Sequence, residues 1–180
     1  MASLRILYSA AVIAQTVARL GQELNRDYGA VTEPVVLLVV LKGALVFAAD
    51  LIRQLHFPCE IACIQASSYR QGTSPDALQV SEMADLTGRT VIVLEDIVDT
   101  GLTLQRILSG LSARSVQVCT LLDKPHRRRV AVPIHYRGLV LIEDEFIVGY
   151  GLDYAERYRE LPDIAVLVPS SLPNEEERSA

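Results

Sequence analysis

Residues 90–103 read Thr-Val-Ile-Val-Leu-Glu-Asp-Ile-Val-Asp-Thr-Gly-Leu-Thr, and this stretch indicates both the fold and the position of a site. Its first five residues are apolar or β-branched, which is typical of a strand buried on both faces of a parallel sheet. Three carboxylates follow at Glu95, Asp96 and Asp99, and a Thr-Gly-Leu-Thr turn then leads into a helix that we expect over residues 103–111. We therefore interpret residues 90–94 as a central strand that ends in acidic side chains.

Strands and helices alternate along most of the rest of the chain. The apolar pattern predicts further strands at residues 34–41, 61–66, 115–122, 140–142 and 165–168, and helices at residues 9–25, with Ser9 as the N-cap, and 43–56. This alternation is typical of an α/β fold with a mainly parallel central sheet flanked by helices. The 180 residues carry no internal repeat or linker, so we expect a single domain over residues 1–180.

Composition disfavours several classes of protein. Lys and Arg number 17 against 22 Asp and Glu, a net charge of −5, which argues against a protein that coats nucleic acid. The longest apolar run, Val35–Leu41, is too short to span a membrane, and the N-terminus does not resemble a signal peptide. We interpret Cys59, Cys63 and Cys119 as small buried packing residues in a reducing, cytoplasmic setting.

The acidic strand end has the chemistry to bind a phosphorylated ribose. Ligands of open α/β sheets bind outside the carboxyl ends of the strands. The backbone N–H groups of the turn, with the hydroxyls of Thr100 and Thr103, suit a phosphate. Glu95 and Asp96 accept hydrogen bonds, so they suit ribose hydroxyls or a divalent cation. The alternative is a strand with acidic residues at a solvated end.

The stretch Val91–Thr103 resembles the phosphoribosyl-pyrophosphate motif of type I phosphoribosyltransferases. Three further segments are similar to those of the hypoxanthine-guanine (6-oxopurine) members. Leu41-Lys42-Gly43 resembles their pyrophosphate loop, Ser68-Tyr69 their mobile-loop dipeptide, and Phe146–Tyr154 (Phe-Ile-Val-Gly-Tyr-Gly-Leu-Asp-Tyr) their purine-binding hood. The resemblance runs in order from about residue 6 to residue 168.

The resemblance implies a type I phosphoribosyltransferase-like fold and a purine-salvage reaction. In addition to the central sheet, we expect a small hood from segments near residues 1–10 and 143–170, and a mobile loop at residues 67–80. The implied enzyme transfers a 5-phosphoribosyl group from phosphoribosyl pyrophosphate to hypoxanthine or guanine, giving IMP or GMP plus pyrophosphate. It uses Mg²⁺, which stabilises the leaving group, acts on small molecules only, and forms a homodimer or homotetramer.

The resemblance also assigns roles to the residues of the acidic stretch. Asp99 matches the general base that faces the purine N7, with a helix N-cap as its structural alternative. Glu95 and Asp96 match the carboxylates beside the ribose hydroxyls and the metal. The other members of this substrate-binding stretch are Ile97, Val98, Thr100, Gly101, Leu102 and Thr103.

Two lysines match other substrate groups. Lys42, with Gly43, matches the pyrophosphate site, where a cis peptide bond between Leu41 and Lys42 would expose a backbone N–H; the alternative for Lys42 is an ordinary lysine at the end of a strand. Lys124 is a hydrogen-bond donor only, so it would read the exocyclic oxygen at purine position 6 and reject a 6-amino group. The alternative for Lys124 is a surface lysine beside residues 127–129, an Arg-Arg-Arg run that we interpret as a solvated basic turn.

The hood segment supplies the remaining candidates. Phe146 would stack on the purine, and Ile147 would offer backbone groups to its edge; the alternative for Phe146 is a core position. Asp153 matches a magnesium-side carboxylate and Arg159 a pyrophosphate-side arginine. Alternatively, Asp153 caps a short helix that follows it, and Arg159 lies on the surface of that helix.

The sequence departs from the family at two positions. Glu145 stands where some relatives carry lysine, so we expect its backbone carbonyl to bind the base and its side chain to have no role. Ser67 replaces the lysine that precedes the Ser-Tyr dipeptide, and Arg70 is the candidate to compensate for it.

Other functions stay open from the sequence alone. Xanthine shares the 6-oxo group, so a xanthine-preferring phosphoribosyltransferase is one alternative, whereas Lys124 and the hood segment argue against a pyrimidine. A non-catalytic RNA-binding regulator on the same scaffold would need a basic face, which the net charge of −5 disfavours. A phosphoacceptor signalling domain would carry its acidic pair after the first strand rather than in mid-chain.

Overall fold

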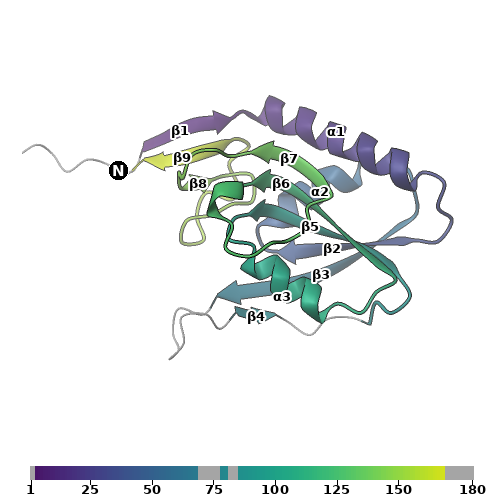
Figure 1. The fold of residues 1–180 in the computed structure, drawn as a ribbon. Helices are drawn as coiled ribbons and strands as arrows, with labels where there is room; N and C mark the ends of the chain where they lie inside the picture. The colour runs from purple at the N-terminus through teal and green to yellow at the C-terminus, as the bar shows by residue number, and fades with distance from the viewer. Residues whose placement is uncertain (1–2, 69–77, 81–84, 169–180) are drawn as a thin grey trace, which may run out of the picture.

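The computed structural model describes residues 3–68, 78–80 and 85–168 and is built around a six-stranded sheet (Figure 1). The strand order is β4-β3-β2-β5-β6-β7. Strands β3, β2, β5, β6 and β7 run parallel, and β4 pairs antiparallel with β3. The bounds are Val35–Leu41 for β2, Cys59–Ser68 for β3, Leu78–Val80 for β4, Thr90–Val98 for β5, Ser115–Asp123 for β6 and Tyr136–Val140 for β7. The expected α/β fold with a mainly parallel sheet is confirmed.

Helices cover both faces of this sheet. Helices α1 (Ala10–Tyr28) and α2 (Ala44–Ile52) lie over one face, and α3 (Leu102–Gly110) lies over the other. Alternate residues of β2 belong to the two opposite cores: Leu37 packs with α1 and α2, whereas Val36 packs with α3. This two-sided burial explains why β2 and the first half of β5 are continuous apolar runs.

A second, three-stranded antiparallel sheet forms the hood, with the order β1-β9-β8. Its strands are β1 (Ser3–Tyr8), β8 (Ile147–Val148) and β9 (Ile164–Val168), so segments from both ends of the chain build it. Figure 1 shows this sheet beside the carboxyl ends of β5 and β6. The hood that the resemblance implies is therefore present, and it lies where it can cover a site at that edge.

Several boundaries differ from those expected. The helix expected over residues 43–56 ends at Ile52, and the strand expected at residues 140–142 lies at Tyr136–Val140. Strand β5 continues to Val98 rather than ending at Leu94. Strands β1, β4 and β8 were not expected from the pattern; β8 has only two residues, too few for any periodicity to appear.

The cysteines are only partly buried, so the expectation of three buried packing residues was wrong. Cys119 is buried, Cys59 is half-buried and Cys63 is exposed, and all three are free thiols. Helix α2 packs over β2 and β5, and Cys63 lies on the neighbouring strand β3, where it is exposed. In the part of the chain that the structure describes, no helix combines the length and apolar character needed to cross a membrane.

Ser9 caps α1 as expected, since its side chain accepts a hydrogen bond from the Val12 amide. Two neighbouring residues of this helix allow a direct test of its packing. Ile13 is 1% exposed in the core, whereas Val12 is 38% exposed. We predict that Ile13→Ala lowers the free energy of unfolding by about 2–5 kcal/mol, and that Val12→Ala changes it by no more than about 0.5 kcal/mol. Denaturant unfolding measures both values, and equal effects would contradict this packing.

Candidate active site

Glu95 and Asp96 lie inside the buried part of β5, near its carboxyl end. They are only 7% and 9% exposed, so the alternative of a solvated strand end is wrong. Pairing with β6 carries the strand past them, because Glu95 is in register with Thr120 and Ile97 with Leu122. The two carboxylates therefore face cavities within the fold rather than bulk water.

Burial raises the pKa of both carboxyl groups in this pair. Burial and the neighbouring Asp96 charge raise the pKa of Glu95 well above its ordinary value. Burial also raises the pKa of Asp96, and hydrogen bonds and the Arg159 charge oppose that rise. Glu95 Oε2 is buried without a hydrogen-bond partner among the described residues. A ligand that brings hydroxyl donors or positive charge would stabilise the ionised pair.

The turn after β5 begins α3 and presents backbone N–H groups. Gly101 is the N-cap of α3, and Leu102 N donates a 3.4 Å hydrogen bond to Thr100 Oγ1. Gly101 has φ +85°, and a Cβ there would come within 2.9 Å of the Val130 carbonyl oxygen, so glycine is required. The alternative role of Asp99 as the helix cap is wrong, because Asp99 precedes this cap by two residues and pairs with Arg127 instead.

The segment after β2 lies directly against the acidic pair. The peptide bond between Leu41 and Lys42 is cis. A Cβ on Gly43 would lie 1.8 Å from Asp96 Oδ2, so only glycine fits between the two segments. Lys42 and Gly43 line one cavity together with Glu95, Asp96 and Arg159.

Asp153 and Arg159 face the same cavity from the hood. Arg159 pairs with Asp153 at 2.7 Å and donates to the Gly151 carbonyl oxygen at 2.7 Å. Lys42 Nζ contacts Glu156 Oε2 at 3.1 Å, which ties the segment after β2 to the hood. Residues 153–163 form turns, so the short helix considered as an alternative is absent there. Instead, Asp153 accepts a hydrogen bond from the Glu156 amide.

A neighbouring cavity collects the candidates for base binding. Its lining is Asp96, Ile97, Asp99, Lys124, Phe146, Ile147, Leu152 and Asp153. Lys124 is 6% exposed, so it is not a surface lysine, and its Nζ donates to the Glu145 carbonyl oxygen at 2.6 Å. Phe146 is 54% exposed, so it is not a core residue. Its ring contacts Tyr154 edge-on, with the centroids 5.5 Å apart.

The Glu145 side chain does have a contact, contrary to expectation. Its carboxylate pairs with Arg5 of β1, while its backbone carbonyl accepts from Lys124. Glu145 thus joins the Lys124 side chain to the hood sheet, which the sequence could not indicate because Arg5 lies 140 residues away along the chain.

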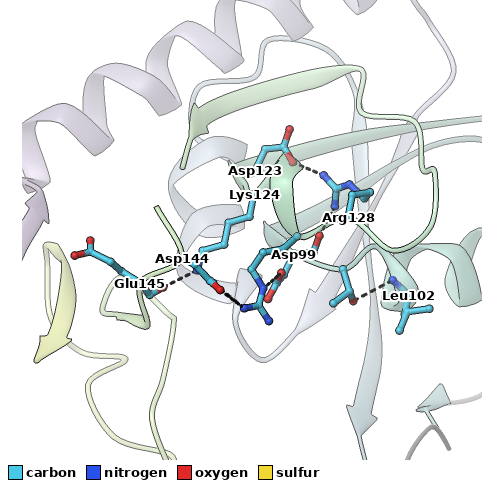
Figure 2. A network of polar contacts seen from close by, with 9 residues as sticks. Asp99, Leu102, Asp123, Lys124, Arg128, Asp144 and Glu145 are labelled. Atoms are coloured by element: carbon cyan, nitrogen blue, oxygen red, sulfur yellow. Dashed lines mark hydrogen bonds and ion pairs between the residues drawn. The ribbon is translucent and has the colours of Figure 1, made fainter. Parts of the chain in front are cut away.

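The basic run after Lys124 is exposed at Arg127 and Arg129, as expected of a solvated turn, but two of its arginines form ion pairs that the sequence did not indicate. Arg127 pairs with Asp99 and Asp144, and Arg128 pairs with the buried Asp123. Figure 2 shows Asp123 beside Arg128, with Asp99 and Asp144 nearby. Sequence reasoning missed Arg127, Arg128 and Glu156 as parts of the site; the only signal was the charge run beside Lys124, and it did not reveal their partners.

The mobile-loop candidates are described only in part. Ser68 ends β3, with its backbone in register with Leu78 of β4, whereas Tyr69 and Arg70 lie outside the described residues. Residues 69–77, most of the expected mobile loop, also lie outside them.

No three acidic, histidine or cysteine side chains among the described residues form a ready metal cluster. The donor set is nevertheless compatible with Mg²⁺, since carboxylates at Glu95, Asp96 and Asp153 line adjoining cavities and one buried oxygen of Glu95 has no partner. Mg²⁺ commonly takes one or two carboxylates and completes its shell with water and substrate phosphates. These residues therefore suit an ion that arrives with a phosphorylated substrate.

The close approach of Gly43 to Asp96 generates a prediction. We expect Gly43→Ala to lower the free energy of unfolding by about 1–3 kcal/mol, because its Cβ forces the two segments apart. In an Asp96→Ala background the same substitution should cost less, since the clashing carboxylate is gone. Denaturant unfolding of the four chains measures this coupling. An equal loss of unfolding free energy in both backgrounds would show that the two residues are not in contact.

Comparison with known proteins agrees with this geometry. Residues 4–155 match the family model described as "Phosphoribosyl transferase domain". The chain is 39% identical to a hypoxanthine phosphoribosyltransferase of Salmonella typhimurium, covering 92% of this chain and 96% of the relative. It is 42% identical to a hypoxanthine-guanine phosphoribosyltransferase of Mycobacterium avium, covering 91% and 85%. A crystal structure of a hypoxanthine-guanine phosphoribosyltransferase from Bacillus anthracis superposes with a TM-score of 0.83 at 40% identity, covering 92% of this chain and all of that one. The chain therefore belongs to the phosphoribosyltransferase family.

Proposed function

We propose that this enzyme transfers the 5-phosphoribosyl group of phosphoribosyl pyrophosphate to hypoxanthine or guanine, releasing pyrophosphate and IMP or GMP. One observation carries the proposal: adjoining cavities bring together the acidic pair, the turn at the start of α3, a buried lysine and an exposed aromatic ring. All three cavities share Asp96 and Asp153, so one extended ligand would contact them together. The substrates named for the relatives support a 6-oxopurine as the acceptor.

Lys124 and Phe146 would select and hold the base. An ammonium group has three donors, and the Glu145 carbonyl takes one of those on Lys124, which leaves donors for the exocyclic oxygen of hypoxanthine or guanine. A 6-amino group would leave this buried donor unpaired. The exposed ring of Phe146 offers a stacking surface, a contact worth about 1–3 kcal/mol per base in comparable sites.

The acidic pair and the adjacent turn would hold the phosphorylated ribose. Thr100, Gly101 and Thr103 line the cavity that also contains Glu95 and Asp96. Backbone N–H groups at the start of α3 and the two threonine hydroxyls suit the 5′-phosphate. The carboxylates of Glu95 and Asp96 suit the ribose hydroxyls, which donate hydrogen bonds.

Glu95, Asp96 and Asp153 are the residues that would hold Mg²⁺ beside the pyrophosphate. When bound, the ion supplies Lewis-acid stabilisation of the charge that develops on the leaving group. Arg159 and the segment at Lys42 and Gly43 would bind the pyrophosphate from the other side of the same cavity. Bound positive charge of this kind explains how a protein of net charge −5 would hold a polyanion.

Asp99 would take the proton from the purine N7 as the ribosyl carbon bonds to N9. It lines the base cavity together with Lys124 and Phe146. The proton leaves the purine for the carboxylate, and the carboxylate returns it to the base in the reverse reaction.

A spectrophotometric assay tests the proposed function. The purified chain is incubated with phosphoribosyl pyrophosphate, Mg²⁺ and, separately, hypoxanthine, guanine, xanthine, adenine and uracil. We expect turnover of hypoxanthine or guanine, and loss of the rate when a chelator removes Mg²⁺. Preferred turnover of xanthine would assign the alternative specificity, and no turnover with tight RNA binding would favour the regulator.

The resemblance also leads us to propose a cytoplasmic homodimer or homotetramer, which sedimentation and cell fractionation would test.

Removing the general base should slow the reaction and leave the fold intact. We predict that Asp99→Asn lowers kcat by about 10²–10⁴-fold, because positioned proton transfer is lost. KM for phosphoribosyl pyrophosphate should stay within about threefold, since Asp99 faces the base. Steady-state kinetics measure both constants. A kcat equal to that of the wild type would remove Asp99 from the chemistry.

Lys124→Met tests base selection, because it keeps the length of the side chain and removes its donors. A hydrogen bond from a charged group is worth about 1.5–3 kcal/mol, so kcat/KM for hypoxanthine should fall by about 10- to 100-fold. The ratio of kcat/KM for hypoxanthine to that for adenine should fall as well. Circular dichroism checks that the variant is folded. An unchanged ratio in a folded variant would show that Lys124 does not read position 6.

A further inference from the structure

Arg127 lies between two carboxylates that belong to different parts of the site. It follows Lys124 in the one-turn 3-10 helix Pro125–Arg127. Its Nε donates to Asp99 Oδ1 at 2.8 Å, and its Nη1 donates to both carboxylate oxygens of Asp144, at 2.6 and 2.8 Å. Figure 2 shows the side chains of Asp99 and Asp144 close to each other, as their shared partner requires. One side chain therefore connects the turn after β5 to the segment before β8.

The backbone of Asp99 is held separately, by Arg128. Arg128 Nη1 donates to the Asp99 carbonyl oxygen at 2.8 Å, and the other end of its guanidinium pairs with Asp123. Asp123 is only 1% exposed and also pairs with Arg137 at 2.8 Å. Since Arg128 has this buried anchor, the position of the main chain at residue 99 does not depend on Arg127. What Arg127 restrains is the carboxylate of Asp99.

The Asp99 side chain needs such a restraint. It is 39% exposed, so without a partner its carboxylate would sample several rotamers. Proton transfer requires the accepting oxygen within hydrogen-bond distance of the purine N7. Arg127 contacts Oδ1, which leaves Oδ2 as the oxygen for the base. A shift of about 1 Å in a reacting group is enough to slow a reaction strongly.

The contacts of Arg127 differ from those of an ordinary surface ion pair. An isolated exposed pair contributes little, because solvent screens it and two long side chains lose freedom. Here one planar guanidinium binds two carboxylates, and Nη1 contacts both oxygens of Asp144. Arg127 also lowers the pKa of Asp144 below its ordinary value, which keeps this anchor ionised. Asp144 lies two residues before Phe146, so the network joins the proton acceptor to the segment that carries the stacking ring.

We propose that Arg127 is a positioning residue, which orients the Asp99 carboxylate toward the purine and is itself held by Asp144. The proposal rests on the proposed function, because it assigns Arg127 a role in that reaction. It is a role in the proton-transfer step and not in the binding of phosphate, so its kinetic signature is a change in kcat.

Arg127→Gln tests this role, with Arg129→Gln as the matched control. Arg129 lies two residues away and is exposed, and its side chain has no hydrogen bond or ion pair with another described residue. We expect Arg127→Gln to lower kcat by about tenfold, a part of the roughly 10²–10⁴-fold that positioned proton transfer contributes. KM for phosphoribosyl pyrophosphate should stay within about twofold. Arg129→Gln should match the wild type, and Asp144→Asn, which keeps Arg127, should lower kcat by a smaller factor of about three.

The decisive step repeats Arg127→Gln in an Asp99→Asn background. If Arg127 acts through the Asp99 carboxylate, Arg127→Gln should cause no further fall in kcat in that background. Three results would overturn this role and leave the proposed function standing. They are the same tenfold loss of kcat in both backgrounds, a rise in KM for phosphoribosyl pyrophosphate in place of the loss in kcat, and an unchanged kcat. No turnover by the wild-type chain would overturn the proposed function, and this role with it.

Discussion

Two adjacent carboxylates held inside a buried strand are the constraint on which the site depends. Ionised carboxylates are costly to bury without partners, and burial raises the pKa of both Glu95 and Asp96. The surrounding structure accommodates them with a glycine at position 43, where any side chain would collide with Asp96, and with the Arg159 charge. The cost of burying the ionised carboxylates that remains favours the binding of hydrogen-bond donors and cations at this edge of the sheet. A phosphorylated sugar with its metal would supply both.

The hood is connected to the central sheet by polar contacts on each side of the cavities. On one side Lys42 pairs with Glu156. On the other, Lys124 donates to the Glu145 carbonyl, and the Glu145 side chain pairs with Arg5 of β1. Glu156 lies in the turns between β8 and β9, and Arg5 lies in β1, so the groups proposed to bind pyrophosphate and base are both connected to segments of the hood. This arrangement would keep the two substrates aligned while the bond between sugar and base forms.

Much of the fold follows from local patterns that the sequence carries. Val35–Leu41 and the start of β5 are apolar on both faces, so their burial in a parallel sheet was predictable. The extent of β5 was not, because acidic residues disfavour a strand and only pairing with β6 extends it to Val98. Strand β8 has two residues and exists through its partner β9, so no local pattern could reveal it.

The site was predictable where residues lie close along the chain. The turn at residues 99–103 follows directly from its motif, and Lys124 and Phe146 were found through resemblance and line the cavity proposed for the base. The contacts of Arg127 could not be foreseen, since a run of three arginines after Lys124 is typical of a solvated turn. Its partner Asp99 lies 28 residues away, and only the parallel pairing of β5 with β6 brings the ends of these strands together.

A crystal structure with a purine nucleoside 5′-monophosphate bound tests directly whether the acidic edge of the sheet holds the phosphorylated sugar. We expect the phosphate at the turn of residues 100–103, the ribose hydroxyls within hydrogen-bond distance of Glu95 and Asp96, and the purine against Phe146. A nucleotide bound on another face, with this edge of the sheet empty, would contradict this expectation.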